Sequence, residues 1–398
     1  MTLHRTVDTV QRAALGTAIG VGVIILLVIL FRIGAFFLNL VAPPTVQPTN
    51  HAYGTLPSIV FPSNAVPQSS LTYSVNTLTG QFPEFPDRVA VFPIQTPEPN
   101  LLNLDRVKQM TAAAGITQDF GKPVPEKFLS GANYEWDEPG GFQRQLAVNI
   151  VSFDFSMTSN YLTNPSVLKA QFLSDENAAI QTAKDFLDKL QLFPADLDLT
   201  KSQNPDPSLH YLSVPQPYAI DNGNIVPTSS LSKAQLIRVD LYQNNLNYQL
   251  TTARPGDPHA IQNSNFSLPV LYSHPPYSTM TFWVGSGDNQ PAVVAANFTH
   301  QNIASSSALA TYPIKTVQEA FTDLKNGNSY VATYTGSSTT IAIVNVFLGY
   351  FMTDEPQPYL MPVYVFEGGN GFFAYVSAVQ ESWIKNAPTP GPGQVITQ

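Results

Sequence analysis

The spacing of apolar residues along this chain changes from a pattern typical of helices to one typical of strands. Three segments, residues 103–116, 174–194 and 316–327, carry apolar residues three or four positions apart, which is the spacing of one helix face. The three stripes consist of Val107, Met110 and Ala114, of Ile180, Ala183, Leu187 and Leu190, and of Val317, Ala320, Phe321 and Leu324. Each segment is therefore predicted to form an amphipathic helix.

Start and stop signals support these helices. Ser174 is the predicted N-cap of the second helix, acidic residues occupy its positive first turn, and Pro194 ends it. In the third helix, Thr316 and Glu319 have the spacing of a capping box. A glycine follows the first and the third helix, as is common after a helix C-terminus.

Apolar and polar residues alternate with a period of two in the segments around these helices, which is typical of strands. The alternation is present in residues 133–136, 142–157, 234–242, 279–285, 291–299, 329–335 and 340–351. A helix followed by antiparallel strands thus recurs about three times. The predicted fold class is α+β, built from repeated helix-plus-antiparallel-sheet units that follow one N-terminal transmembrane helix.

The transmembrane prediction rests on residues 13–31, which are apolar and carry no charge over 19 positions. A helix of that length is about 28 Å long, close to the ~30 Å hydrocarbon core of a bilayer. A cleaved signal peptide is the alternative, but the apolar run exceeds the ~7–15 residues of its hydrophobic region. Arg5 and Arg12 precede the span, and the next cation after Arg32 is Arg88. The N-terminus is therefore predicted to be cytoplasmic and the C-terminal ectodomain to lie outside the plasma membrane.

The proline content separates a predicted stalk from the folded units in the rest of the chain. Eleven prolines between residues 41 and 100 predict an extended, partly ordered stalk. Within and after it, alternation over residues 71–78 and 88–94 predicts short strands that dock on the first unit. The predicted organisation is a cytoplasmic tail at 1–12, a transmembrane helix at 13–41, a stalk at 42–87, α+β units at 88–172, 173–312 and 313–385, and a disordered tail at 386–398.

Charge and cysteine content exclude several classes of function. The chain of 398 residues has a formal net charge of −9 and no dense basic run, which argues against a nucleic-acid partner. It has no cysteine, which excludes disulfides, thiolate metal sites and cysteine nucleophiles. Apolar residues make up 43% of the chain, enough for a sizeable buried core.

The pattern of helices and strands resembles that of the PepSY-like domains, and more particularly of membrane-anchored regulators of the YycH and YycI type. The segments that carry the resemblance are "ENAAIQTAKDFLDKLQL", "AQLIRVDLYQNNLN", "YPIKTVQEAFTDLKNG" and "VFLGYF", followed by "YLMPVYVFEG" and "FFAYVSAV". They span roughly residues 100 to 380. The resemblance implies a non-enzymatic ectodomain that contacts a sensor kinase or another envelope protein.

No motif of a catalytic, metal or nucleotide site is present in the sequence. The six histidines are scattered without ligand spacing, and neither GxSxG nor a phosphate-binding glycine loop occurs. No catalytic residue, metal site or cofactor is therefore predicted. The remaining acidic candidates are "EWDE" at 135–138 and the pair Asp354 and Glu355. Two carboxylates held close together in a cleft perform general acid–base chemistry, but both groups lie beside prolines in predicted turns, where solvated acids are common.

The stretch "PYLMPVYVFEGGNGFFAYVSAVQ" at 358–380 predicts the closing hairpin of the last unit. Both of its faces are apolar and "EGGNG" supplies the turn, so a hairpin covered on both sides is favoured, with tyrosine hydroxyls pointing outward. A proline within the first strand, Pro362, lacks a backbone donor and points to a sheet edge or a bulge at that position. This edge is the one predicted partner-binding surface, formed by Tyr359, Met361, Pro362, Tyr364 and Tyr375.

These observations predict a single-pass, membrane-anchored, extracytoplasmic binding or regulatory protein that acts through protein–protein contacts in the cell envelope. The expected partners are the membrane and another envelope protein, with no nucleic acid and no nucleotide. Two alternatives remain open. The first is a cell-wall-associated hydrolase that uses a carboxylate pair, and the second is a passive structural component of the envelope.

Overall fold

The structure is a computed structural model. It describes residues 23–33, 46, 48–67, 71–116, 118–119, 122–123, 127–171, 173, 175–199, 215–254, 257–304 and 309–385. The chain divides into two compact units. One comprises residues 1–48 and 250–264, and the other comprises residues 49–249 and 265–398.

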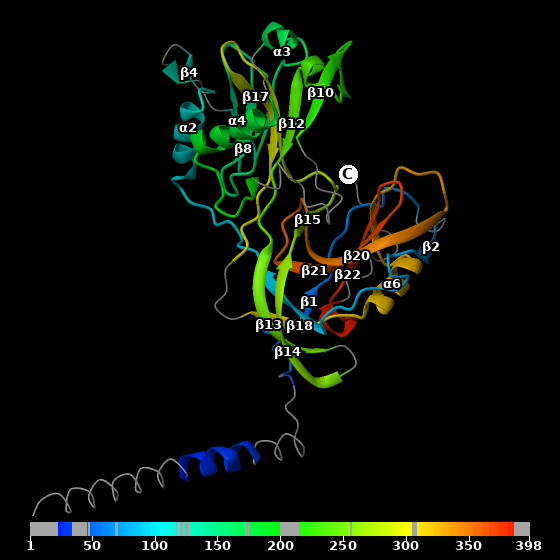
Figure 1. Ribbon diagram of the computed structural model, residues 1–398. Coiled ribbons are helices and arrows are strands. Elements are labelled where there is room, and N and C mark those ends of the chain that lie inside the picture. The colour runs from blue at the N-terminus through cyan, green and yellow to red at the C-terminus, as the bar shows by residue number, and fades with distance from the viewer. Residues whose placement is uncertain are drawn as a thin grey trace, which may run out of the picture. The chain divides into compact units, whose positions relative to one another are not determined.

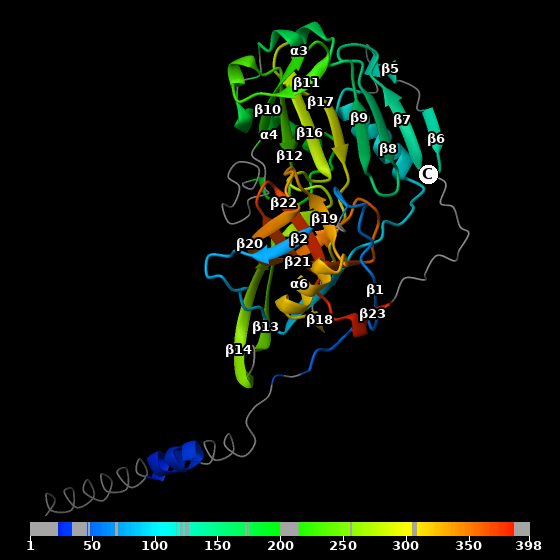
Figure 2. The same cartoon turned by 90° about the vertical axis from the view of Figure 1, so that its right-hand side faces the viewer.

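A nine-stranded antiparallel sheet forms a large part of the second unit. Its strand order is β11-β10-β12-β16-β17-β9-β8-β7-β6, and Figure 2 shows its central strands side by side. The strands are β6 (Lys127–Ser130), β7 (Asn133–Asp137), β8 (Gln145–Asn149), β9 (Phe155–Thr158), β10 (Gln216–Asp221), β11 (Asn224–Pro227), β12 (Leu236–Asp240), β16 (Met280–Ser286) and β17 (Pro291–Phe298).

Helices cover one face of this sheet. Helix α4 (Glu176–Lys189) packs on β12, β16 and β17, and helix α2 (Asn103–Ala113) lies near it at the same face (Figure 1). Their apolar stripes join the alternating buried residues of the strands in one core that includes Trp136 and Phe282. The short helix α3 (Pro165–Lys169) contacts β16, and its Val167 packs in a smaller cluster with Leu236 of β12 and Val294 of β17.

A second, eight-stranded sheet belongs to the same unit. Its main path is β15-β20-β21-β22-β19, to which β2, β3 and β18 add. Helix α6 (Val317–Lys325) packs against β22. The strands are β2 (Thr72–Val75), β3 (Arg88–Pro93), β15 (Val270–Tyr272), β18 (Ala310–Pro313), β19 (Tyr330–Thr333), β20 (Thr340–Met352), β21 (Tyr359–Gly368) and β22 (Phe372–Ser377).

Smaller elements complete the described chain. Strand β1 (Leu56–Pro57) pairs in parallel with β23 (Ile384–Lys385), and β4 (Gln118–Asp119) pairs with β5 (Lys122–Pro123). Strands β13 (Leu246–Arg254) and β14 (Asp257–Leu268) form a two-stranded sheet. Two 3₁₀ helices, η2 (Leu231–Lys233) and η3 (Glu381–Trp383), also occur. In the first unit, the side chains of Thr252 and Ser264 share a hydrogen bond of 2.7 Å between β13 and β14.

The predicted fold class is wrong. The described residues hold far more strand than helix, and the strands form two large sheets instead of three separate helix-plus-sheet units. The nine-stranded sheet takes strands from both sides of residue 172, and the eight-stranded sheet combines β2, β3 and β15 with the strands after residue 312. Local periodicity identified these strands, but it carries no information on which distant strand each one pairs with.

The predicted transmembrane helix is not supported either. Of residues 13–41, the structure describes a helix over 23–33, and the remainder lies outside the described residues, as do the whole of the tail predicted at 1–12 and the whole of the tail predicted at 386–398. Within the part of the chain that is described, no helix is both long and apolar enough to cross a membrane.

Candidate functional site

A polar cavity of about 680 Å³ opens in the second unit. Four segments line it: residues 94–103 after β3, residues 151–154 before β9, residues 299–302 after β17, and residues 354–358 between β20 and β21. Each of these four segments directly adjoins a sheet strand, so the sheets hold the walls of the polar cavity in place. Volumes of 300–1,000 Å³ are typical of small-ligand sites.

Strand pairing brings two titratable residues together at this cavity. Strands β9 and β17 are neighbours, with Phe155 opposite Phe298, and the rings of these two residues stack with centroids 5.1 Å apart. The next residues along the chain therefore also meet: the backbone N–H of His300 donates to Oδ1 of Asp154 at 3.2 Å.

A network of hydrogen bonds fixes His300. Its Nε2 lies 2.8 Å from Oδ1 of Asp196, and the buried Gln243 donates from Nε2 to Oδ2 of the same carboxylate at 2.8 Å. Because Asp196 only accepts, Nε2 of His300 carries the hydrogen. Nε2 of Gln243 also donates to the backbone oxygen of Gln301 at 3.2 Å. The network therefore anchors the segment 299–302 that lines the polar cavity.

The two carboxylates near His300 have pKa values that move in opposite directions. Burial raises the pKa of Asp154, and hydrogen bonds from Ser152 and from the His300 backbone oppose this only in part. Burial alone would also raise the pKa of Asp196, but hydrogen bonds from His300 and Gln243 outweigh it, so the pKa of Asp196 is lowered. Asp154 is thus a carboxylate whose charge the fold stabilises poorly.

The lining of the polar cavity is acidic. Its charged residues are Glu98, Asp154 and Asp354, and neither lysine nor arginine occurs among the residues that line it. The guanidinium of Arg106 lies outside the lining, 4.8 Å from the ring centroid of the lining residue Phe153. Among the described residues, no cluster of histidine, aspartate and glutamate is arranged to hold a metal ion.

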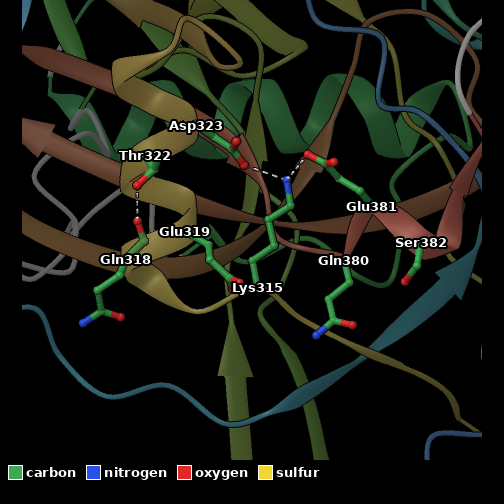
Figure 3. Close-up of a pocket in the computed structure, with 8 residues that line it drawn as sticks. All are labelled: Lys315, Gln318, Glu319, Thr322, Asp323, Gln380, Glu381 and Ser382. Carbon is green, nitrogen blue, oxygen red and sulfur yellow. Dashed lines mark hydrogen bonds and ion pairs between the residues drawn. The ribbon is translucent and has the colours of Figure 1, made fainter.

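A second hollow, the Lys315 groove, has a volume of about 510 Å³ and lies between α6 and residues 380–382. Figure 3 shows the ammonium group of Lys315 between two carboxylates, with Nζ 2.6 Å from Oδ2 of Asp323 and 3.3 Å from Oε1 of Glu381. The Lys315 side chain is 12% exposed. The charge of Lys315 is already paired, and its two ion pairs connect α6 to η3.

The predicted partner-binding edge lies inside a sheet. Strand β21 pairs with β20 on one side and with β22 and β3 on the other. At Pro362, the carbonyl oxygen accepts from the backbone N–H of Ala378 at 3.1 Å, and the Cα partner on the other side is Tyr350. Pro362 therefore lies between paired strands although it lacks a backbone donor. No free strand edge is present at this described position.

The side chains of that predicted surface are mostly buried. Met361, Pro362, Tyr364 and Tyr375 are buried, whereas Tyr359 is partly exposed and its ring stacks on Tyr53 with centroids 4.8 Å apart. The prediction that the tyrosine hydroxyls point outward is wrong. The hydroxyl of Tyr364 donates to the backbone oxygen of Lys315 at 2.7 Å, and that of Tyr375 to the backbone oxygen of Tyr272 at 2.8 Å. The expectation that both faces of the hairpin are covered is confirmed.

The acidic segment 135–138 forms ion pairs across neighbouring strands and a turn. Glu135 pairs with Lys127 at 2.7 Å, while Glu138 pairs with Arg144 at 2.6 Å and also accepts from its Nε at 3.1 Å. Asp137 is exposed. Of the other predicted pair, Asp354 lines the polar cavity and Glu355 is exposed.

Sequence reasoning missed Asn103, Asp154 and Asp196 entirely and found no role for His300. These residues lie up to 197 positions apart (300 − 103), and no spacing connects them. Asp154 and His300 meet because β9 pairs with β17, and the segment after β3 joins them because Ile94 pairs with Ile303. No local signal encodes either pairing.

Comparison with known proteins leaves the family open. No protein-family model matches the chain, and no curated protein matches it. A crystal structure of an uncharacterized protein from Eubacterium rectale ATCC 33656 matches at 12% identity and a TM-score of 0.33, over 82% of this chain and 88% of that chain. So low a score carries no argument about fold or function. The resemblance to PepSY-like domains and to YycH and YycI regulators stays a prediction.

Proposed function

We propose that this chain is a non-enzymatic binding protein of the cell envelope, which acts outside the plasma membrane by contacting another protein through the polar cavity. The observation that carries the proposal is the polar cavity itself. It is concave, its size suits a binding site, and it is lined by hydrogen-bonding side chains on walls held by two sheets.

The placement of the acidic candidates supports binding over hydrolysis. Catalysis by a carboxylate pair requires both groups to face one substrate in a cleft. Instead, Glu135 and Glu138 are engaged by Lys127 and Arg144, which is the ordinary role of acids at strand pairs and turns. The resemblance to regulators of the YycH and YycI type points to the same non-enzymatic role.

The proposed location is supported by the sequence alone. The apolar, uncharged segment 13–31 and the arginines before it are the pattern of a chain held at a membrane with its C-terminal part outside. Most of that segment lies outside the described residues. Extraction of membranes at alkaline pH tests this part of the proposal: the protein is expected in the membrane pellet, and recovery in the supernatant would contradict it.

A blocking substitution tests the proposed contact. Asn302 is exposed and lines the polar cavity, so Asn302→Trp should fill part of its entrance. Asn297, which is exposed on β17 and outside the cavity lining, gives the matched control Asn297→Trp. The full-length variants are expressed in their native membrane, crosslinked, and the recovered proteins are quantified by mass spectrometry.

The proposal expects one stoichiometric partner to be recovered with the unaltered protein and with Asn297→Trp, and to be lost with Asn302→Trp. Equal recovery with Asn302→Trp would contradict the proposed site. Recovery of no partner, under conditions that preserve other envelope complexes, would contradict the proposed function.

A further inference from the structure

Asn103 is a mostly buried residue whose side-chain amide is free to bind the content of the polar cavity. It begins helix α2, is 8% exposed, and lines the polar cavity. Its backbone N–H donates to the oxygen of Asn100 at 3.1 Å, but its side-chain amide contacts no hydrogen-bonding group in the described parts of the chain. Its amide atoms are not among the buried groups that lack a partner, so they reach the open space of the polar cavity and can bond to a ligand there.

Two glutamines of the lining direct their side-chain donors into the protein. Nε2 of Gln301 donates to the backbone oxygens of Thr353 and Glu355 at 2.7 and 3.2 Å. Nε2 of Gln357 donates to the backbone oxygen of Phe351 at 2.9 Å. These donors are therefore already used within the protein, while the carboxylates of Glu98, Asp154 and Asp354 remain as acceptors for a ligand with N–H donors.

The charge of the lining indicates which class of ligand suits the polar cavity. Asp154 is half-buried and accepts hydrogen bonds from Ser152 and from the His300 backbone. No lysine or arginine of the described chain forms an ion pair with it. Asp354 and Glu98 add two exposed carboxylates at the rim. An anion would be repelled here, whereas a cation would satisfy a carboxylate that the fold leaves uncompensated.

We propose that the polar cavity receives an arginine side chain of the partner protein, with Asp154 and Asn103 as the residues that bind its guanidinium group. This inference rests on the proposed function and names the chemistry of the contact. A guanidinium group carries five N–H donors in one plane and keeps its charge throughout the physiological pH range. It therefore matches an acidic lining better than a neutral ligand does. A cavity of about 680 Å³ also accommodates residues that flank the arginine.

Two peptides of similar shape, one charged and one neutral, test whether the charge of the guanidinium group determines binding. The first is a capped pentapeptide with one central arginine between glycine and serine residues, and the second has citrulline in its place, which is neutral and similar in shape. Binding to the detergent-solubilised full-length protein is measured by calorimetry and compared with the same titrations of three variants, Asp154→Asn, Asn103→Ala and Asp137→Asn. Asp137 is exposed on β7 and outside the cavity lining, so its variant is the control for loss of one negative charge.

The arginine peptide is expected to bind with a dissociation constant of about 1 mM or tighter, and the citrulline peptide about tenfold or more weaker. Asp154→Asn should weaken arginine binding about tenfold or more, and Asn103→Ala about three- to tenfold. Asp137→Asn should leave the affinity unchanged. Equal affinity for the two peptides, unchanged affinity of Asp154→Asn, or no binding of the arginine peptide would overturn the proposal.

These outcomes are distinct from those that test the proposed function. If Asn302→Trp abolishes partner capture while the arginine peptide fails to bind, the partner contact stands and the arginine assignment is wrong. If capture is insensitive to Asn302→Trp, the proposed contact site is wrong whatever the peptide does.

Discussion

The buried hydroxyl of Tyr375 gives a direct test of how the closing hairpin is packed. Tyr375 lies on β22, has 0% exposure, and donates to the backbone oxygen of Tyr272 at 2.8 Å. Burial raises the pKa of Tyr375 well above its ordinary value. The substitution Tyr375→Phe removes only the hydroxyl oxygen and keeps the ring, whose neighbours include Phe373 and Tyr330.

The expected cost follows from burial and from the loss of one donor. A neutral hydrogen bond contributes about 0.5–1.5 kcal/mol, and leaving a buried acceptor unsatisfied raises the cost to about 1–3 kcal/mol. We therefore expect Tyr375→Phe to lower the free energy of unfolding by about 1–2 kcal/mol. For a unit of this size the melting temperature should fall by roughly 1–3 °C.

Thermal unfolding followed by circular dichroism measures this effect, with Tyr334→Phe as the control. The hydroxyl of Tyr334 also donates to a backbone oxygen, that of Ser338 at 2.7 Å, but at an exposed site. Water replaces that bond, so the control should change stability by less than about 0.5 kcal/mol. A Tyr375→Phe protein as stable as the control would refute the buried placement of this hydroxyl.

Three further predictions concern charge and packing. Arg144→Ala should cost about 2–4 kcal/mol in denaturant unfolding, because it leaves the mostly buried carboxylate of Glu138 without its partner. Gly349→Ala should cost about 1–3 kcal/mol, because the added methyl group would lie 2.5 Å from Cδ1 of the buried Leu271. Asp154→Asn should raise the melting temperature at pH 7, and the gain should disappear as the pH falls to the ordinary range of a carboxyl group.

The sign of the last prediction follows from linkage. A carboxyl group whose pKa is raised by folding binds its proton more tightly in the folded state, so its contribution is most favourable at low pH and is lost as the pH rises through the folded pKa. A neutral asparagine avoids that loss. An Asp154→Asn protein less stable than the unaltered protein at pH 7 would contradict this prediction.

For the packing prediction at Gly349, Gly140→Ala is the control, because its added methyl group meets open space.

Features that depend on neighbouring residues were predictable from the sequence. The helix predicted at 316–327 is observed as α6, and its capping box forms as expected: the Thr316 hydroxyl accepts from the Glu319 backbone N–H at 3.2 Å, and the Glu319 carboxylate accepts from the Thr316 backbone N–H at 2.7 Å. Helix α4 is also found, although Asp175 is the N-cap that accepts from the Ala178 backbone. The predicted cap, Ser174, lies outside the described residues.

Features that depend on distant pairing were not predictable. The short strands predicted at 71–78 and 88–94 exist as β2 and β3, but β2 joins β20 in parallel and β3 pairs with β18 and β21. Nothing in these segments specifies partners more than 200 positions away. The error in fold class has this origin: the sheets assemble across the chain, whereas periodicity describes each strand alone.

The same reasoning explains the misplaced binding surface. Pro362 suggested an edge because proline lacks a backbone donor, yet the structure uses its carbonyl oxygen as an acceptor and surrounds it with paired strands. The polar cavity, by contrast, is built from isolated polar residues in connecting segments. Loops on a rigid sheet scaffold commonly carry function, but their side chains converge only once the sheets are assembled.

The most direct test of the central claim is site-specific photocrosslinking from the rim of the polar cavity. A photoreactive phenylalanine derivative replaces Thr96, which is exposed and lines the cavity, or Asn297, which is exposed outside the lining. We predict that the Thr96 position alone yields an adduct, and that the crosslinked partner peptide contains an arginine. Equal adducts from both positions, or an adduct from Asn297 only, would contradict the claim that the polar cavity is the contact site.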